Sequence, residues 1–285
     1  MITGKTHVVG VVGDPVGHSF SPIVHNAAFE ALGMDWAYVA FPVAAARGPQ
    51  VVAAMKTLGL LGLSVTTPHK DSVASFADEM SSDVRLLGAA NTLVRWPDGR
   101  VRAETTDGLG CIGALRQDGC DVAGKRCAVL GAGAAGRAVI LALARSGAAS
   151  IVVINRNEER AITAAELGRA AGAQTTVGSS NAVLDCDVVI NSTSVGLGAA
   201  VDDASALLPE VHLVTPGQVF HDLTYHPLET AMMRVATQRG ATVIGGLGML
   251  IHQAALQFTL WTRVQAPVKV MFEAAHAELA RRSLT

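Results

Sequence analysis

Residues 126–136, RCAVLGAGAAG, contain three glycines in the spacing G-x-G-x-x-G, at Gly131, Gly133 and Gly136. The residues before them predict a buried strand over Arg126–Leu130, and the residues after them predict a helix over Arg137–Ser146. In such a turn the first glycine permits a sharp change of direction, the second lets a pyrophosphate approach the backbone, and the third allows close helix–strand packing. Unpaired N–H groups at the helix N-terminus can then bind the phosphates. The stretch predicts dinucleotide binding; the alternative is a tight strand–helix turn with no ligand.

The chain after this motif continues to alternate strands and helices. The expected strands are Ile151–Asn155, Asp187–Asn191, Val219–Leu223 and Thr242–Ile244, and the expected helix is Glu158–Ala171. This alternation is typical of the parallel sheet of a Rossmann-like fold. Two further helices are predicted near the end of the chain, over Leu250–Arg263 and Val268–Arg281, with Pro267 between them.

The first hundred residues also alternate. The predicted elements are strands over His7–Val12, Trp36–Pro42 and Leu61–Val65, and helices over Ser21–Leu32, over Gln50–Leu58 and from about His69. Strands separated by helices imply a mostly parallel sheet. Asn91–Trp96 and Val101–Thr105 flank a Pro-Asp-Gly turn and predict a hairpin.

The length of 285 residues suffices for two domains, although length alone also allows one large domain. The predicted fold class is α/β with two domains. We place boundaries near residues 108 and 245, which gives a first domain over 1–108, a dinucleotide-binding domain over 109–245 and closing helices over 246–285. If those helices return to the first domain, the dinucleotide-binding domain is an insertion in it.

The composition excludes several classes of function. Half of the residues are apolar and 16% are charged, and the net charge is −2 with no basic run. These values argue against nucleic acid or an anionic membrane as a partner. The N-terminus lacks the pattern of a signal peptide, and the richest apolar stretch is too short to span a bilayer. The sequence therefore predicts a soluble, cytoplasmic protein.

The cysteines and histidines do not indicate a metal site. The four cysteines contain no CxxC pair, and we interpret them as free buried thiols in a reducing compartment. The nine histidines show no H-x-x-x-H or similar ligand spacing beside acidic residues. We expect no metal.

The cofactor type depends on the residues that follow the second strand of the dinucleotide-binding domain. NAD-selective folds place Asp or Glu there to bind the ribose hydroxyls, whereas this chain has Asn155 and Arg156. A guanidinium can grip a 2′-phosphate through two hydrogen bonds, so the pair favours NADP. The alternative is that Arg156 is an ordinary exposed charge, partly neutralised by Glu158 and Glu159.

Polar residues in the first domain lie where loops meet helices. Ser19 and Ser21 flank Phe20 just before a predicted helix, where two hydroxyls could hold a carboxylate or could simply cap the helix. Lys70 lies near the start of another helix. A cation at that end of a helix dipole is unfavourable, which suggests a functional reason, although surface lysines are the commoner case.

The order of these motifs resembles that of the shikimate dehydrogenase family over about residues 8–260. The matching stretches are 19–22 (SFSP), 64–70 (SVTTPHK), 88–92 (GAANT), 106–108 (TDG), 131–136, 155–156 (NR), 191–196 (NSTSVG), 222–227 (DLTYHP), 246–250 (GLGML) and Gln253. The resemblance implies a substrate domain and an NADP-binding domain with a cleft between them. It also implies reduction of 3-dehydroshikimate to shikimate in the shikimate pathway of aromatic amino-acid biosynthesis.

The resemblance further implies a role for each matching residue. Lys70 and Asp107 resemble the catalytic acid–base pair. Residues that resemble substrate contacts are Ser19, Ser21, Thr66, Asn91, Tyr225 and Gln253. Residues that resemble cofactor contacts are Gly131, Ala132, Gly133, Ala134, Ala135, Asn155, Arg156, Thr193, Leu223, Gly246 and Met249.

Two positions depart from the family pattern. Ser64 stands where the family more often has Asn, so a weaker or water-bridged contact is expected there. Asn157 stands where Thr is common, and it can still donate a hydrogen bond to phosphate, so the preference for NADP is not overturned.

Two rival functions stay open. One rival is an enzyme for quinate or an aminated analogue that uses NAD(P). The other is a non-catalytic NADP-binding regulatory protein. The expected partner is a small-molecule substrate, with the chain acting as a monomer or homodimer.

Overall fold

The computed structural model describes residues 2–200 and 202–282, and its contacts divide the chain into two compact units. Unit 1 contains the residues up to Thr106 and those from Gln253 onward, whereas unit 2 extends from Asp107 to His252. The second division falls inside one continuous helix, α9 (Gly246–Thr262). The boundaries predicted from the sequence were near 108 and 245.

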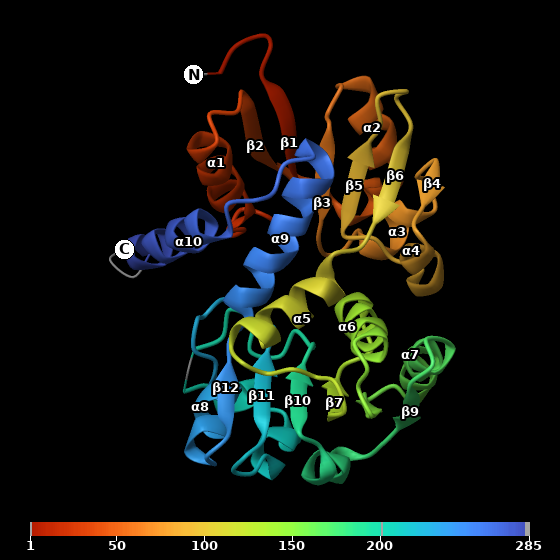
Figure 1. Ribbon diagram of the computed structural model, residues 1–285, viewed down its shortest axis with the longest axis vertical. Helices are drawn as coiled ribbons and strands as arrows, with labels where there is room; N and C mark the ends of the chain where they lie inside the picture. The colour runs from red at the N-terminus through yellow and green to blue at the C-terminus, as the bar shows by residue number, and fades with distance from the viewer. Residues whose placement is uncertain (1, 201, 283–285) are drawn as a thin grey trace. The chain divides into compact units, whose positions relative to one another are not determined.

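Unit 1 is built on a six-stranded sheet in the order β2-β1-β3-β5-β6-β4 (Figure 1). The strands are β1 (His7–Gly13), β2 (Trp36–Pro42), β3 (Gly62–Val65), β4 (Glu79–Met80), β5 (Thr92–Arg95) and β6 (Val101–Glu104). Strands β2, β1 and β3 run parallel, whereas β5 is antiparallel to both β3 and β6. The β5–β6 hairpin is the one predicted from the Pro-Asp-Gly turn.

The helices of unit 1 pack around this sheet. They are α1 (Ser21–Ala31), α2 (Val51–Thr57), α3 (Lys70–Ala74), α4 (Ser82–Leu87), the second part of α9, and α10 (Val268–Arg282). All residues of β3 are buried, as expected for a strand covered on both faces. Helix α10 packs against α1, and the Arg282 guanidinium lies 4.2 Å from the centre of the Phe20 ring.

Unit 2 is built on a fully parallel sheet in the order β12-β11-β10-β7-β8-β9. Its strands are β7 (Arg126–Leu130), β8 (Ser150–Ile154), β9 (Gln174–Val177), β10 (Val188–Asn191), β11 (Val219–Asp222) and β12 (Thr242–Ile244). Counted from β7, the order is 3-2-1-4-5-6, that of a Rossmann dinucleotide-binding sheet. The predicted α/β class with mostly parallel sheets is confirmed.

Two apolar clusters cover the two faces of this sheet. One joins the sheet to α5 (Asp107–Gln117), α6 (Ala134–Arg145) and α7 (Glu158–Ala170); the other joins it to α8 (Ala231–Gln238) and two short 3₁₀ helices over 180–185 and 209–213. Burial of apolar side chains on both faces is the dominant favourable term for such a domain. No helix within the described residues is long and apolar enough to cross a membrane.

The four cysteines all lie in unit 2, and all are free and buried, as predicted. Burial raises the pKa of the Cys127 thiol to about 12 and that of the Cys186 thiol to about 11. Burial also raises the pKa of Cys111 and Cys120. Because the thiolate is the reactive form, these side chains behave as small apolar core residues.

Candidate functional site

The glycine turn of unit 2 has the geometry expected for binding a pyrophosphate. Gly131 has φ +102°, a conformation that favours glycine, and a Cβ on Gly136 would collide with the carbonyl oxygen of Gly131. A Cβ on Gly133 would meet nothing within 4 Å, so the backbone there is open to a ligand. Helix α6 starts at Ala134 rather than at the predicted Arg137, with no side-chain cap and no acidic residue in its first turn. Its first N–H groups and dipole suit a phosphate.

The residue that follows β8 is hydrogen-bonded to the glycine turn. The Ala132 N–H donates to Asn155 Oδ1 at 3.2 Å, and Asn155 Nδ2 donates to the Asn157 carbonyl at 2.8 Å. Asn157 itself caps α7 by accepting from the Arg160 N–H at 2.9 Å. Asn157 Oδ1 is thus engaged in the fold, and the side chains of Arg156 and Asn157 are both exposed. Glu158 and Glu159, which the alternative interpretation invokes to neutralise Arg156 in part, are both exposed in the first turn of α7.

A buried carboxylate fixes the ends of β10 and β11. Asp222 accepts from Asn191 Nδ2 at 3.0 Å, from the Thr224 N–H at 3.0 Å and from Thr230 Oγ1 at 2.7 Å. Asn191 Oδ1 in turn accepts from the backbone and hydroxyl of Thr193 at 3.1 and 2.8 Å. Burial raises the pKa of Asp222 despite these bonds. The network holds the predicted cofactor contact Thr193 beside the glycine turn, because a Cβ on Gly131 would lie 3.0 Å from the Thr193 methyl group.

The remaining predicted ligand contacts of unit 2 lie near the ends of the same strands. The Leu223 N–H donates to the Asn191 carbonyl at 3.0 Å, and Gly246 approaches the Leu223 carbonyl so closely that a Cβ would collide with it. Met249 is buried in the apolar cluster with α5, α6 and α7, and Tyr225 is half-buried after β11. Asp107 is the first residue of α5 and is 6% exposed.

The serine pair of unit 1 lies at the start of α1. Ser19 Oγ accepts from the Ser21 N–H at 3.2 Å, whereas Phe20 at the N-cap position makes no side-chain cap. Ser21 is 5% exposed and Ser19 is half-buried. Ser19 therefore caps the start of α1 in part, as the alternative interpretation of the serine pair proposed. A hydroxyl that accepts this bond can still donate its own proton to a carboxylate.

Thr66 and Lys70 lie on the turn between β3 and α3. The Thr66 N–H donates to the Val12 carbonyl at 3.0 Å, and the Lys70 carbonyl accepts from the Ala90 N–H at 2.8 Å. Gly13 lies so close to Thr66 that a Cβ would collide with the threonine methyl group. The ends of β1 and β3 and the segment before β5 thus fix the backbone of Lys70, which is the first residue of α3.

Asn91 and Gln253 meet in a buried polar cluster of unit 1. Asn91 Nδ2 lies 2.9 Å from Thr106 Oγ1 and 3.3 Å from Gln253 Oε1, and Thr106 Oγ1 lies 3.4 Å from the same Gln253 oxygen. Asn91 Oδ1 accepts from the Thr106 N–H at 2.8 Å. Two predicted substrate contacts, 162 positions apart, are therefore adjacent, and Thr106 joins them directly before Asp107.

Two further residues of this cluster, Tyr38 and Gln257, were not found from the sequence. Ser64 donates to Gln257 Oε1 at 2.6 Å and accepts from Tyr38 Oη at 2.6 Å. The Ser64 hydroxyl is therefore engaged inside the core, and the weaker or water-bridged ligand contact expected there stays a prediction. The signal that could have revealed Gln257 was its position four residues after Gln253, because residues i and i+4 share a helix face.

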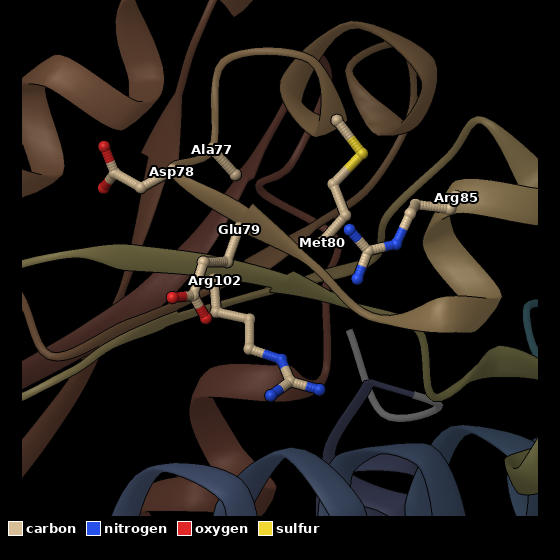
Figure 2. A pocket seen from close by; sticks show the side chains of 6 residues that line it. All are labelled: Ala77, Asp78, Glu79, Met80, Arg85 and Arg102. Atoms are coloured by element: carbon tan, nitrogen blue, oxygen red, sulfur yellow. The ribbon is translucent and has the colours of Figure 1, made fainter.

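A surface pocket of unit 1 contains none of these residues. Figure 2 shows its side chains, which come from the segment before β4, from β4 itself, from α4 and from β6: Ala77, Asp78, Glu79, Met80, Arg85 and Arg102. Asp78 pairs with Lys56 at 2.7 Å, and Glu79 pairs with Arg100. The pocket is separate from the buried polar cluster and from the turn that carries Lys70.

The sheet order and the glycine turn together define unit 2 as a dinucleotide-binding domain, joined to a second α/β unit with its own polar cluster. Family models match at residues 11–93 (shikimate dehydrogenase substrate binding domain), 114–198 (shikimate/quinate 5-dehydrogenase) and 246–276 (shikimate 5′-dehydrogenase C-terminal domain). The chain belongs to the shikimate dehydrogenase family. The resemblance seen in the sequence is thereby confirmed.

Individual relatives match over nearly the whole chain. A shikimate dehydrogenase (NADP⁺) of Methanothermobacter thermautotrophicus is 40% identical and covers 99% of this chain and 100% of its own. A crystal structure of a shikimate dehydrogenase in complex with NADP⁺ superimposes with a TM-score of 0.89 at 36% identity, covering 98% of both chains. The Thermus thermophilus enzyme in complex with NADP(H) and shikimate gives a TM-score of 0.86 at 32% identity, covering 95% of this chain and 99% of its own.

Proposed function

We propose that this chain catalyses the reversible NADPH-dependent reduction of 3-dehydroshikimate to shikimate, a step of the shikimate pathway. The prediction of an NADP-dependent shikimate dehydrogenase is confirmed at the level of family, and the full-length identity to relatives of that name carries the proposal. The exposed Arg156 after β8, where an NAD-selective fold has an acid, supports NADP as the cofactor.

The polar residues of the candidate site are assigned to binding either the cofactor or the substrate. In this proposal the glycine turn and the α6 N-terminus bind the pyrophosphate, Arg156 binds the 2′-phosphate, and Thr193 and Met249 contact the rest of the cofactor. Ser19 and Ser21 bind the substrate carboxylate. The ring hydroxyls are bound by Thr66, Asn91, Asp107 and Gln253, and Tyr225 is a further substrate contact.

Lys70 and Asp107 are proposed as the acid–base pair. NADPH supplies the hydride when bound. The Lys70 ammonium polarises the ketone, stabilises the alkoxide that develops on its oxygen, and donates the proton that completes the alcohol. Asp107 accepts a hydrogen bond from Lys70 or from the neighbouring substrate hydroxyl, and so orients the donor. In the reverse direction Lys70 receives the proton from the alcohol.

The first test is loss of turnover on removal of the proton donor. Lys70→Ala should lower kcat by roughly 10²–10⁴ in an NADPH-oxidation assay with 3-dehydroshikimate, because general acid catalysis contributes about that much. The KM for substrate should change much less. Lys56→Ala, at an exposed lysine of the same unit, is the matched control and should retain activity. Unchanged turnover in Lys70→Ala would remove this lysine from the mechanism.

The same assay distinguishes the rival enzymes. Comparing shikimate, quinate and an aminated analogue, each with NADP⁺ and NAD⁺, should give the highest kcat/KM for shikimate with NADP⁺. A preference for quinate or for NAD⁺ would assign the chain to the rival enzyme function. Tight NADP⁺ binding without turnover would support the regulatory alternative.

We also propose that the enzyme works in the cytoplasm, as a monomer or homodimer. The four free thiols suit a reducing compartment. Sedimentation at micromolar concentration measures the number of chains, and a larger assembly would contradict this part of the proposal.

A further inference from the structure

Three side chains of α9 form one stripe that contacts residues 91–93, which lie just before and at the start of β5. Gln253, Gln257 and Trp261 are spaced by four, so they share a face of the helix. Gln253 Oε1 lies 3.3 Å from Asn91 Nδ2, Gln257 Nε2 donates to the Asn91 carbonyl at 3.2 Å, and Trp261 Nε1 donates to the Leu93 carbonyl at 3.0 Å. The stripe fixes how α9 is rotated about its axis relative to the sheet of unit 1.

The middle member of the stripe uses both of its N–H donors and also accepts a hydrogen bond. Gln257 is 1% exposed, and its amide also donates to Thr92 Oγ1 at 3.0 Å. Its Oε1 accepts from Ser64, which is in turn held by Tyr38. A primary amide has two N–H donors, and both are occupied by Asn91 and Thr92. A buried amide with such partners is held in one orientation, since rotating it would leave buried polar groups unpaired.

The far end of this chain of bonds is anchored by stacked rings. The Tyr38 ring lies 4.4 Å from the ring of His25 with an interplanar angle of 3°. Burial lowers the pKa of His25 to about 3, and the nearby Gln257 amide only partly opposes that effect. His25 is therefore neutral and acts as a flat apolar support for Tyr38.

The bonds continue from Gln257 to the amide of Asn91. Thr92 Oγ1 accepts from Gln257 and donates to Asn91 Oδ1 at 2.8 Å, and the Thr106 N–H donates to the same oxygen. Both acceptor positions of Asn91 Oδ1 are thus filled from the protein. Asn91 must then present its NH₂ group, and not its oxygen, toward Gln253 and Thr106.

We infer that Gln257 is a positioning residue for substrate binding. Through Thr92 it fixes which side of the Asn91 amide is a donor, and through the helix stripe it places Gln253 opposite that donor. The inference rests on the proposed function, because it assigns Asn91 and Gln253 to the ring hydroxyls of the substrate. It adds Gln257, Thr92 and Ser64 as residues that act on the substrate only through other side chains.

The test separates positioning from general stability. Gln257→Met keeps the approximate volume and removes both donors and the acceptor. We expect the KM for shikimate at saturating NADP⁺ to rise about tenfold or more, the equivalent of losing one well-oriented hydrogen bond. The KM for NADP⁺ should stay within about twofold. Thr259→Ala, on the exposed side of the same helix, is the control and should change neither value.

A second variant keeps the inference testable if Gln257→Met does not fold. Thr92→Val removes only the hydroxyl between Gln257 and Asn91, and should reproduce the selective rise in the KM for shikimate. A folded variant with an unchanged KM, or with equal increases for both ligands, would overturn the inference while the proposed function stands. Wild-type protein without turnover of shikimate would overturn the proposed function, and the inference with it.

Discussion

In the proposed function, cofactor choice depends on Arg156, because its exposed guanidinium follows β8. Arg156→Gln should raise the KM for NADPH about tenfold or more, since hydrogen bonds to charged groups contribute about 1.5–3 kcal/mol. The KM for NADH should be nearly unchanged, because NADH lacks the 2′-phosphate. Steady-state kinetics with both cofactors measures the difference.

Arg160→Gln is the matched control, at an exposed arginine one turn into α7. It should leave the ratio of the two KM values as in the wild type. If Arg156→Gln weakens NADH and NADPH equally, the guanidinium does not recognise the 2′-phosphate.

At the scale of single residues, the sequence predicted best where backbone geometry dictates the amino acid. The glycine turn was recognisable because a positive φ at Gly131 and the close approach at Gly136 both require glycine. The hydrogen-bond partners of Ser64 were not predicted, for the opposite reason. Its partners Tyr38 and Gln257 lie 26 and 193 positions away, and no local pattern records such a contact.

At the scale of elements, β3 and α9 fit together at one tight contact. A Cβ on Gly62 would overlap the indole of Trp261. Gly62→Ala should therefore lower the free energy of unfolding by about 1–3 kcal/mol, as overpacking does. Combining it with Trp261→Leu should cost less than the sum of the two single changes, because the smaller side chain removes the clash.

Urea unfolding of the two single variants and the double variant gives the coupling energy directly. Gly17→Ala is the control, because a Cβ at Gly17 would meet nothing within 4 Å. Gly33→Ala is not suitable as a control, because Gly33 has a positive φ. Strict additivity of Gly62→Ala and Trp261→Leu would show that this contact does not limit how closely the helix and strand approach.

Elements with strong patterns were predicted, and those set by distant packing were not. The core strands β1, β7 and β10 were predicted because their sequences are apolar runs. Strands β9 and β4 were not predicted, because β9 is polar and largely exposed and β4 has only two residues. Helix α9 was predicted from Leu250 but begins at Gly246. Glycine is a weak helix former, and the early glycines serve close packing: a Cβ on Gly248 would lie 3.1 Å from that of Ala114 on α5.

At the scale of the whole molecule, each unit contains a buried histidine whose pKa is strongly lowered. Burial lowers the pKa of His25 in unit 1 to about 3 and that of His221 in unit 2 to about 4, from an ordinary value of 6.5. The unfolded chain therefore binds protons below pH 6.5 that the folded chain does not. Stability should fall as the pH drops from 6.5 toward these values, by about 2 kcal/mol per histidine between pH 7 and pH 5.

Urea unfolding at pH 7 and pH 5 measures this dependence. His25→Phe should reduce the loss of stability between the two pH values by about 2 kcal/mol, whatever its effect at pH 7. His212→Gln, at an exposed histidine, should leave the dependence as in the wild type. An equal loss in wild type and His25→Phe would mean that His25 is not buried as a neutral ring.

The buried cysteines make the native chain suitable for site-specific chemical labelling. Their raised pKa values and their inaccessibility should make all four slow to react with maleimides at neutral pH. A single cysteine introduced on an exposed helix position would then be the fast-reacting thiol. A fluorescent or spin probe could be attached there while the protein keeps its own four cysteines, and a second introduced cysteine would place a probe in the other unit.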